Sequence, residues 1–193
     1  IKSYPLKERK NKLSFKDFAS TFNADASFKS FFASLPNILA GKKLKELVKE
    51  ILRAHHRGKP VLWAMGAHVI KCGLSPLINN LIHERIVNAI ALNGAGAIHD
   101  VEIALIGETS EDVEESLPTG KFGMAQETAE FINNSLKEGA KRGWGAGKAI
   151  GHMLLKTEAP YKKFSLLATA AINDIPATIH IAIGTDVIHM HPS

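Results

Sequence analysis

The pattern of apolar positions predicts helices alternating with strands after a polar N-terminal stretch. Residues 42–57 carry apolar side chains at helical spacing, with lysines and glutamates on the opposite face. Residues 61–65 are apolar throughout, residues 88–92 are apolar after Asn88, and both stretches have the length of strands. A helix over residues 74–85 is predicted between them. Strands that are apolar on both sides are typical of a parallel sheet covered on both faces. The pattern therefore predicts a β-α-β unit with a right-handed crossover.

The second half of the chain continues the alternation. An acidic, glycine-containing stretch over residues 107–125 is predicted to be a functional loop or to hold a short helix of its own. Beyond it we expect helices over residues 127–138, 145–156 and 164–173 and a strand over residues 177–183. The fold class expected is α/β, with an open, doubly wound, Rossmann-like parallel sheet in a single domain over residues 1–193. Residues 1–40 form its basic, phenylalanine-rich N-terminal region.

The turn after the second predicted strand is the strongest pointer to a ligand. The strand runs into Asn93-Gly94-Ala95-Gly96, and apolar residues at helical spacing resume at Ile98. A strand, a glycine turn and a helix leave backbone N–H groups free to meet an anion such as a dinucleotide phosphate. The common G-x-G-x-x-G fingerprint would need a third glycine where His99 stands, so only its first half is present.

Ionisable side chains gather at the predicted carboxyl ends of the strands, where open α/β sheets bind ligands. They are His99, His191, Asp100, Glu102 and Asp186. Such a cleft suits a cationic amine, because carboxylates hold ammonium groups and a neutral imidazole accepts a proton near neutral pH. In the alternative interpretation Asp100 caps the following helix and the histidines are structural.

Two other sequence patterns, a possible metal centre and a possible phosphate loop, give weaker evidence for a functional site. A metal centre could draw on a pool of histidines and carboxylates, but neither an H-E-x-x-H motif nor paired cysteines are present. The members of that pool are His68, His99, His180, His189, His191, Asp100, Glu102 and Asp186. Residues 143–148 look like a phosphate loop, but only three residues separate the glycines and Ala149 follows the lysine. We therefore predict no nucleoside-triphosphate site there.

Composition and charge narrow the range of partners. The hydrophobic content of 45% and charged content of 22% are typical of globular proteins, and no apolar run has the length of a membrane helix. The single cysteine, Cys72, fits a reducing compartment, so a cytoplasmic protein without a membrane partner is expected. Residues 1–60 hold 14 Lys and Arg against 5 Asp and Glu. No nucleic-acid motif accompanies this charge, which indicates a solvated face and no nucleic-acid partner.

Three stretches together resemble the NAD-binding core of the deoxyhypusine synthase family. Residues 66–73, Gly-Ala-His-Val-Ile-Lys-Cys-Gly, stand where that family has S-N-L-I-S-S-G. The turn at residues 93–96 stands at its T-A-G-G, and residues 186–191 resemble D-M-I-F-F-H. The resemblance implies an NAD-binding domain in a homotetramer. It also implies NAD-dependent transfer of an aminoalkyl group from a polyamine such as spermidine to an amine acceptor, as in the related homospermidine synthases.

The resemblance also assigns residues. It places NAD against Ala67, His68, Val69, Ile70, Lys71, Asn93, Gly94 and Ala95. His191 falls on the histidine that contacts the polyamine, and with His99 it makes the expected catalytic pair. Ile98 and His99 stand where the family has two glutamates, so Asp100, Glu102 and Asp186 would bind the substrate.

The family's imine-bearing lysine lies beyond the last matched histidine and has no counterpart before Ser193. We therefore expect a chain truncated at its C-terminus or a homologue without this chemistry. Two alternatives to the transferase stay open. One is a metal- or histidine-dependent enzyme on the same fold, centred on His99, Asp100, His189 and His191. The other is a non-catalytic dinucleotide- or partner-binding domain.

Overall fold

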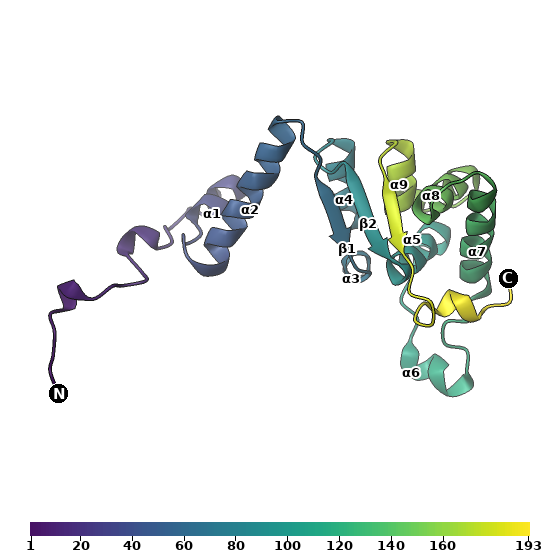
Figure 1. The fold of residues 1–193 in the computed structure, drawn as a ribbon, viewed down its shortest axis with the longest axis horizontal. Coiled ribbons are helices and arrows are strands. Elements are labelled where there is room, and N and C mark those ends of the chain that lie inside the picture. Colours follow the sequence, from purple (N-terminus) through teal and green to yellow (C-terminus); the bar gives the residue numbers. More distant parts are fainter. The chain divides into compact units, whose positions relative to one another are not determined.

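The computed structural model describes residues 1–193, whose contacts divide them into two compact units (Figure 1). Residues 1–56 form the first unit and residues 57–193 the second. The expected single domain over residues 1–193 stays a prediction. No helix is both long enough and apolar enough to cross a membrane.

The first unit is built on two helices, α1 (Phe28–Ser34) and α2 (Leu39–His56), preceded by the single 3-10 turns η1 (Leu6–Glu8) and η2 (Phe15–Asp17). Lys45 of α2 donates from Nζ to the carbonyl oxygen of Ala33 at 3.0 Å and to that of Leu35 at 2.5 Å. A cation at these carbonyls suits the C-terminal end of α1, where the last carbonyls lack partners within the helix. Helix α2 buries none of its residues, so its predicted apolar face is present but uncovered.

The second unit is an α/β structure around a three-stranded parallel sheet in the order β1-β2-β3. The strands are β1 (Leu62–Met65), β2 (Ala89–Asn93) and β3 (Ala177–His180). Helices α3 (His68–Lys71) and α4 (Ser75–His83) connect the first two strands. The second connection holds α5 (Gly94–Ile106), α6 (Val113–Ser116), η3 (Leu117–Thr119), α7 (Gln126–Lys141), α8 (Ala146–Lys156), η4 (Lys162–Phe164) and α9 (Leu166–Ile172), and η5 (Val187–Met190) follows β3.

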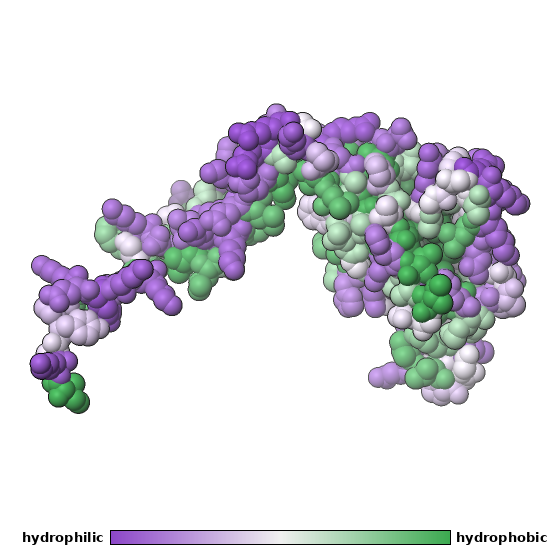
Figure 2. All heavy atoms as spheres, viewed as in Figure 1, coloured by the Kyte–Doolittle hydropathy of each residue, from purple (hydrophilic) through white to green (hydrophobic).

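Within residues 57–193 the helices cover one face of the sheet (Figure 1). The face against the helices carries Trp63, Met65, Ile90, Leu92, Ala177 and Ile179, which join the hydrophobic core. On the opposite face Leu62 is 62% exposed and Thr178 and His180 are exposed. In Figure 2 apolar surface accordingly shows over the strands.

The predicted α/β class and open parallel sheet are confirmed, whereas the expected covering of both faces of the sheet is not found within residues 57–193. The strand order explains the difference. Each strand is added beside the previous one in the same direction. Because parallel crossovers are right-handed, such an order places every connecting helix on the same face. A doubly wound sheet needs a reversal of strand order, which β1-β2-β3 does not contain.

A close backbone contact explains Gly147, one of the glycines at residues 143–148, without a phosphate. A Cβ on Gly147 would stand 2.2 Å from the carbonyl oxygen of Ala177 in β3. The glycine therefore lets α8 approach the strand backbone, a packing role that glycine fills because it lacks a Cβ. The apolar interior is completed by α5, which buries Ala97, Ile98 and Val101.

Candidate functional site

Two adjoining cavities lie beside α5, and the first of them, the strand-end cavity, opens at the carboxyl end of the sheet. The strand-end cavity has a volume of 470 Å³ and the acidic cavity one of 560 Å³. They share the side chains of Glu102, Ser110, Glu111, Ala125 and Thr128. Both volumes lie in the range of sites for small molecules. The position agrees with the expectation that ligands of open α/β sheets bind beyond the strand ends.

The strand-end cavity is assembled from segments far apart in the sequence. Asn93, Ala95 and His99 come from the turn after β2 and from α5, and Lys71 comes from the end of α3. The segment after β3 contributes Thr185 and Asp186. The remaining wall is largely apolar and includes Ile98, Val113, Phe122, Val187 and Ile188.

The turn itself begins α5. Asn93 caps the helix, since its side-chain oxygen accepts the N–H of Gly96 at 2.8 Å. The first N–H groups of a helix have no partner within it, and they carry the positive end of the helix dipole. The helix thus starts at Gly94, earlier than the apolar spacing indicated, and its first turn borders the cavity through Asn93 and Ala95.

Asp186 lies at this helix terminus. The residue is 7% exposed, and Oδ2 accepts the N–H of Ala182 at 2.9 Å. A Cβ placed on Gly94 would stand 1.9 Å from the same oxygen. His189 approaches from the other side, with Nε2 3.8 Å from Oδ2. A carboxylate therefore rests where the dipole of α5 favours negative charge.

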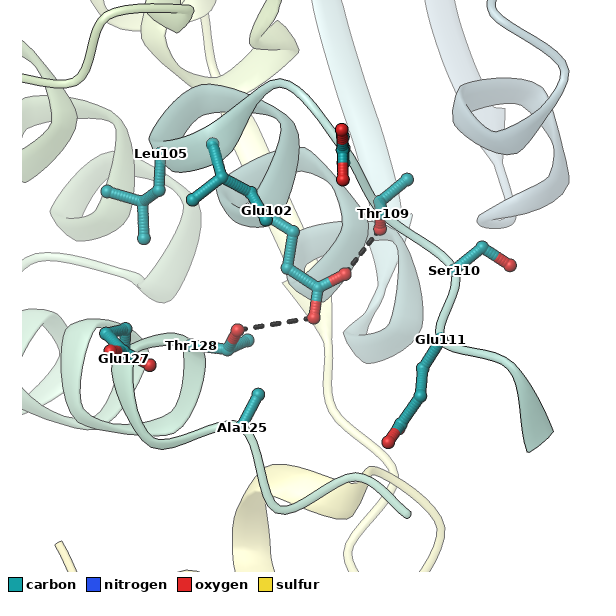
Figure 3. A pocket seen from close by; sticks show the side chains of 10 residues that line it. Glu102, Leu105, Thr109, Ser110, Glu111, Ala125, Glu127 and Thr128 are labelled. Atoms are coloured by element: carbon teal, nitrogen blue, oxygen red, sulfur yellow. Dashed lines mark hydrogen bonds between the residues drawn. The ribbon is translucent and has the colours of Figure 1, made fainter. Parts of the chain in front are cut away.

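A chain of hydrogen bonds links His99, Thr109 and Glu102 at the junction of the two cavities. His99 Nδ1 lies 2.6 Å from Thr109 Oγ1, and the Thr109 hydroxyl donates to Glu102 Oε2. Thr128 of α7 donates to the other oxygen, Oε1, at 3.2 Å. Figure 3 shows Glu102 directed between Thr109 and Thr128.

Glu102 is held in its ionised form by these neighbours. Burial opposes ionisation, but the hydrogen bonds with His99, Thr109 and Thr128 and the charge of His99 outweigh it, so the pKa of Glu102 lies below its ordinary value. His99 Nδ1 stands 3.5 Å from Glu102 Oε2. The acidic cavity adds Glu108, Glu111 and Glu127 to its wall, together with apolar Leu105 and Ile106.

Asp100 takes a structural position instead of the substrate-binding one that the sequence analysis expected. Its side chain is 1% exposed and lines neither cavity. The carboxylate accepts the Ser165 hydroxyl at 2.6 Å and the N–H groups of Leu166 and Leu167 at 2.7 and 3.1 Å. It therefore caps α9 rather than its own helix. Burial raises the pKa of Asp100 to about 6 against the lowering effect of these three hydrogen bonds.

The structure brings together only part of the expected site. His99, Glu102, Asp186, Lys71, Asn93 and Ala95 line the strand-end cavity. Gly94 contacts Asp186 beside this cavity. Ala67 and Ile70 are buried, and His68 is exposed. Val69 packs against the core. His191 does not line the cavity, and its Nδ1 lies 2.8 Å from the Ser193 hydroxyl oxygen.

The alternative metal centre is not formed. No three side chains among the histidines, cysteines and carboxylates lie close enough together to hold a metal ion. Asp100 lies in the core and His189 beside Asp186, so the expected set of His99, Asp100, His189 and His191 does not converge.

Sequence reasoning missed the two threonines of the site. Thr109 lies in the acidic stretch that was expected to be functional because of its length, and that expectation was the only available signal. Thr128 sits in the first turns of α7, where nothing in the pattern distinguishes it from a surface polar residue. Both act through Glu102, which only the folded chain brings near them.

The known proteins that match this chain are found among solved structures. No family model matches the chain, and no curated protein does. A solved structure that does match is described as a conserved putative LOR/SDH protein from Methanococcus maripaludis S2. The sequences are 16% identical with a TM-score of 0.49, and the match covers 96% of this chain. This chain spans about half of that protein, 49% of its length.

These findings correct the resemblance to deoxyhypusine synthase. The solved structure reported above is described as a LOR/SDH protein, and no family model or curated relative supports a deoxyhypusine synthase. The assignment to that family is therefore withdrawn, and with it the aminoalkyl transfer from a polyamine. The motifs behind it are short and glycine-rich, and such turns recur wherever a strand passes into a helix.

Proposed function

We propose that residues 57–193 bind a nicotinamide adenine dinucleotide at the carboxyl end of the sheet. The observation that carries the proposal is the turn Asn93–Gly96, which starts α5 at the wall of the strand-end cavity. The first turn of α5 presents the positive end of the helix dipole to a phosphate, beside the Asp186 carboxylate that borders the same turn. Lys71, at the end of α3, adds a positive charge to the same wall.

The charges of the cavity fit the two ends of such a ligand. The phosphates suit the side formed by Lys71 and the start of α5. The oxidised nicotinamide ring is a cation, and the carboxylates of Glu102 and Glu111, which also line the cavity, suit a positive charge. The apolar wall, with Ile98 and Phe122, offers a surface for an aromatic ring.

Isothermal titration calorimetry of the full chain with NAD, NADH and NADP tests the proposal. Lys71→Ala should weaken binding by about fivefold, since an exposed charge contact contributes on the order of 1 kcal/mol. Lys148→Ala is the matched control, because Lys148 is also exposed but lines a different cavity. Absence of binding at millimolar dinucleotide, or equal losses in the two variants, would overturn the proposal.

A further inference from the structure

The direction of the hydrogen bonds fixes where the proton of His99 lies. A threonine hydroxyl has one hydrogen, and that of Thr109 is donated to Glu102 Oε2. The oxygen of Thr109 must therefore accept the hydrogen bond that joins it to His99, so Nδ1 of the imidazole carries the hydrogen. In the neutral ring Nε2 is then left with its lone pair.

The imidazole of His99 borders the strand-end cavity, and Nε2 is the ring nitrogen that Thr109 does not engage. The imidazole lines that cavity and not the acidic one. Its Nδ1 side is turned to Thr109 and Glu102, and the His99 side chain keeps 18% of its surface exposed. The other charged groups on the same wall are Lys71, Glu111 and Asp186.

We infer that His99 is a catalytic residue, the base that accepts a substrate proton at Nε2 during oxidation of a small alcohol in the strand-end cavity. This inference rests on the proposed function. Oxidation of an alcohol breaks the carbon–hydrogen bond and the oxygen–hydrogen bond of the carbinol group. The hydride goes to the nicotinamide dinucleotide as oxidant, the proton goes to Nε2, and the carbon–oxygen bond becomes double.

Thr109 and Glu102 are positioning residues in this scheme. Proton uptake makes an imidazolium, whose charge the Glu102 carboxylate stabilises from 3.5 Å. Thr109 holds the ring so that Nδ1 points away from the substrate. The apolar side chains of Ile98, Val113 and Val187 offer a surface for a short carbon chain.

Nitrogen-15 NMR of the imidazole in the unliganded full chain tests the arrangement without any cofactor. Wild-type protein should show His99 protonated at Nδ1. Thr109→Val, which removes the hydroxyl and keeps the shape, should shift the population towards Nε2–H, and Thr109→Ser should restore the wild-type signal. Protonation of wild-type His99 at Nε2, or an unchanged signal in Thr109→Val, would refute the inferred base.

Kinetics with a panel of short alcohols and amines give the second readout, from the absorbance of the reduced nicotinamide. His99→Asn should lower kcat for alcohols by about 10² or more while the dissociation constant for NAD stays unchanged. His83→Asn, an exposed histidine outside the cavity, should leave both unchanged.

The outcomes separate the two proposals. NAD binding without turnover of any alcohol, or turnover that survives His99→Asn, would overturn the inferred base and leave dinucleotide binding intact. Turnover of amines alone would overturn the alcohol as substrate. Failure to bind NAD, even with His99 protonated at Nδ1, would overturn the proposed function and the oxidation together.

Discussion

The carboxylate of Asp186 rests on the α-carbon of Gly94, so closely that a methyl group on Gly94 would stand 1.9 Å from Oδ2. The two residues are far apart in the sequence, one at the start of α5 and the other after β3. Parallel pairing of β2 with β3 puts their carboxyl ends side by side and so brings the two residues together. A glycine is required at this helix start because a neighbouring side chain fills the space of its Cβ.

Gly94→Ala should therefore destabilise the second unit. The added methyl group must displace the Asp186 carboxylate, and overpacking of this kind costs about 1–3 kcal/mol of unfolding free energy. Chemical denaturation measures the change. Gly145→Ala adds the same group where no atom lies within 4 Å and should cost much less. Equal effects of the two substitutions would contradict the close contact.

Asp186→Asn should tighten binding of the dinucleotide. The amide keeps the size of the side chain and an acceptor for the N–H of Ala182, but it removes a negative charge from the start of α5. A phosphate would then meet less repulsion, and we expect the dissociation constant to fall by about fivefold. Calorimetry measures this, with the exposed Asp25→Asn as control. Weaker binding would mean that the carboxylate itself contacts the ligand.

Asp100 should make stability fall as pH rises from 4 to 6. Burial raises its pKa in the folded state from the ordinary 3.8 to about 6, so the folded chain holds the proton to higher pH than the unfolded chain. The contribution of Asp100 to the free energy of unfolding is about 3 kcal/mol. It is complete below pH 4 and is lost above pH 6. The free energies of unfolding of the wild type and of Asp100→Asn are measured at several pH values. Their difference at each pH gives the contribution of Asp100. A difference that is constant with pH would refute the shift.

Leu154→Ala should unfold the second unit more easily by about 2–5 kcal/mol, because a buried leucine leaves a cavity when truncated. Leu154 of α8 is fully buried, whereas Leu77 of α4 is 65% exposed. Leu77→Ala is the matched control and should lower the free energy of unfolding by well under 1 kcal/mol. Thermal or urea unfolding monitored by circular dichroism compares them. Similar losses would indicate that α8 is not part of the core.

The elements with a strong periodic pattern were predictable. The strand at residues 61–65 and the helix at residues 145–156 correspond to β1 and α8 within a residue. The expected strand over residues 177–183 ends as β3 at His180, because only the residues that pair with β2 can continue the ladder. The short helix expected within the acidic stretch is present as α6.

The candidate site was predictable only in part. Position at the strand ends follows from the parallel β-α-β pattern, and it correctly brought His99, Glu102 and Asp186 to one cavity. Asp100 sits one residue from His99, yet it points into the core and caps α9. Neighbours in a helix diverge by 100°, since one turn takes 3.6 residues. The rotation of α5 about its own axis, relative to the sheet, therefore decides whether His99 or Asp100 reaches the cavity.

The sequence by itself determined the parallel α/β class, the glycine turn after β2 and the edge of the sheet at which ligands should bind. These depend on local apolar spacing and on chain connectivity, which are properties of short stretches. Only the tertiary structure decided that one face of the sheet carries all the helices, that Asp186 covers Gly94 and that Thr109 orients His99 against Glu102. Each of these depends on the direction of side chains from separate elements, which is fixed when the elements pack against one another.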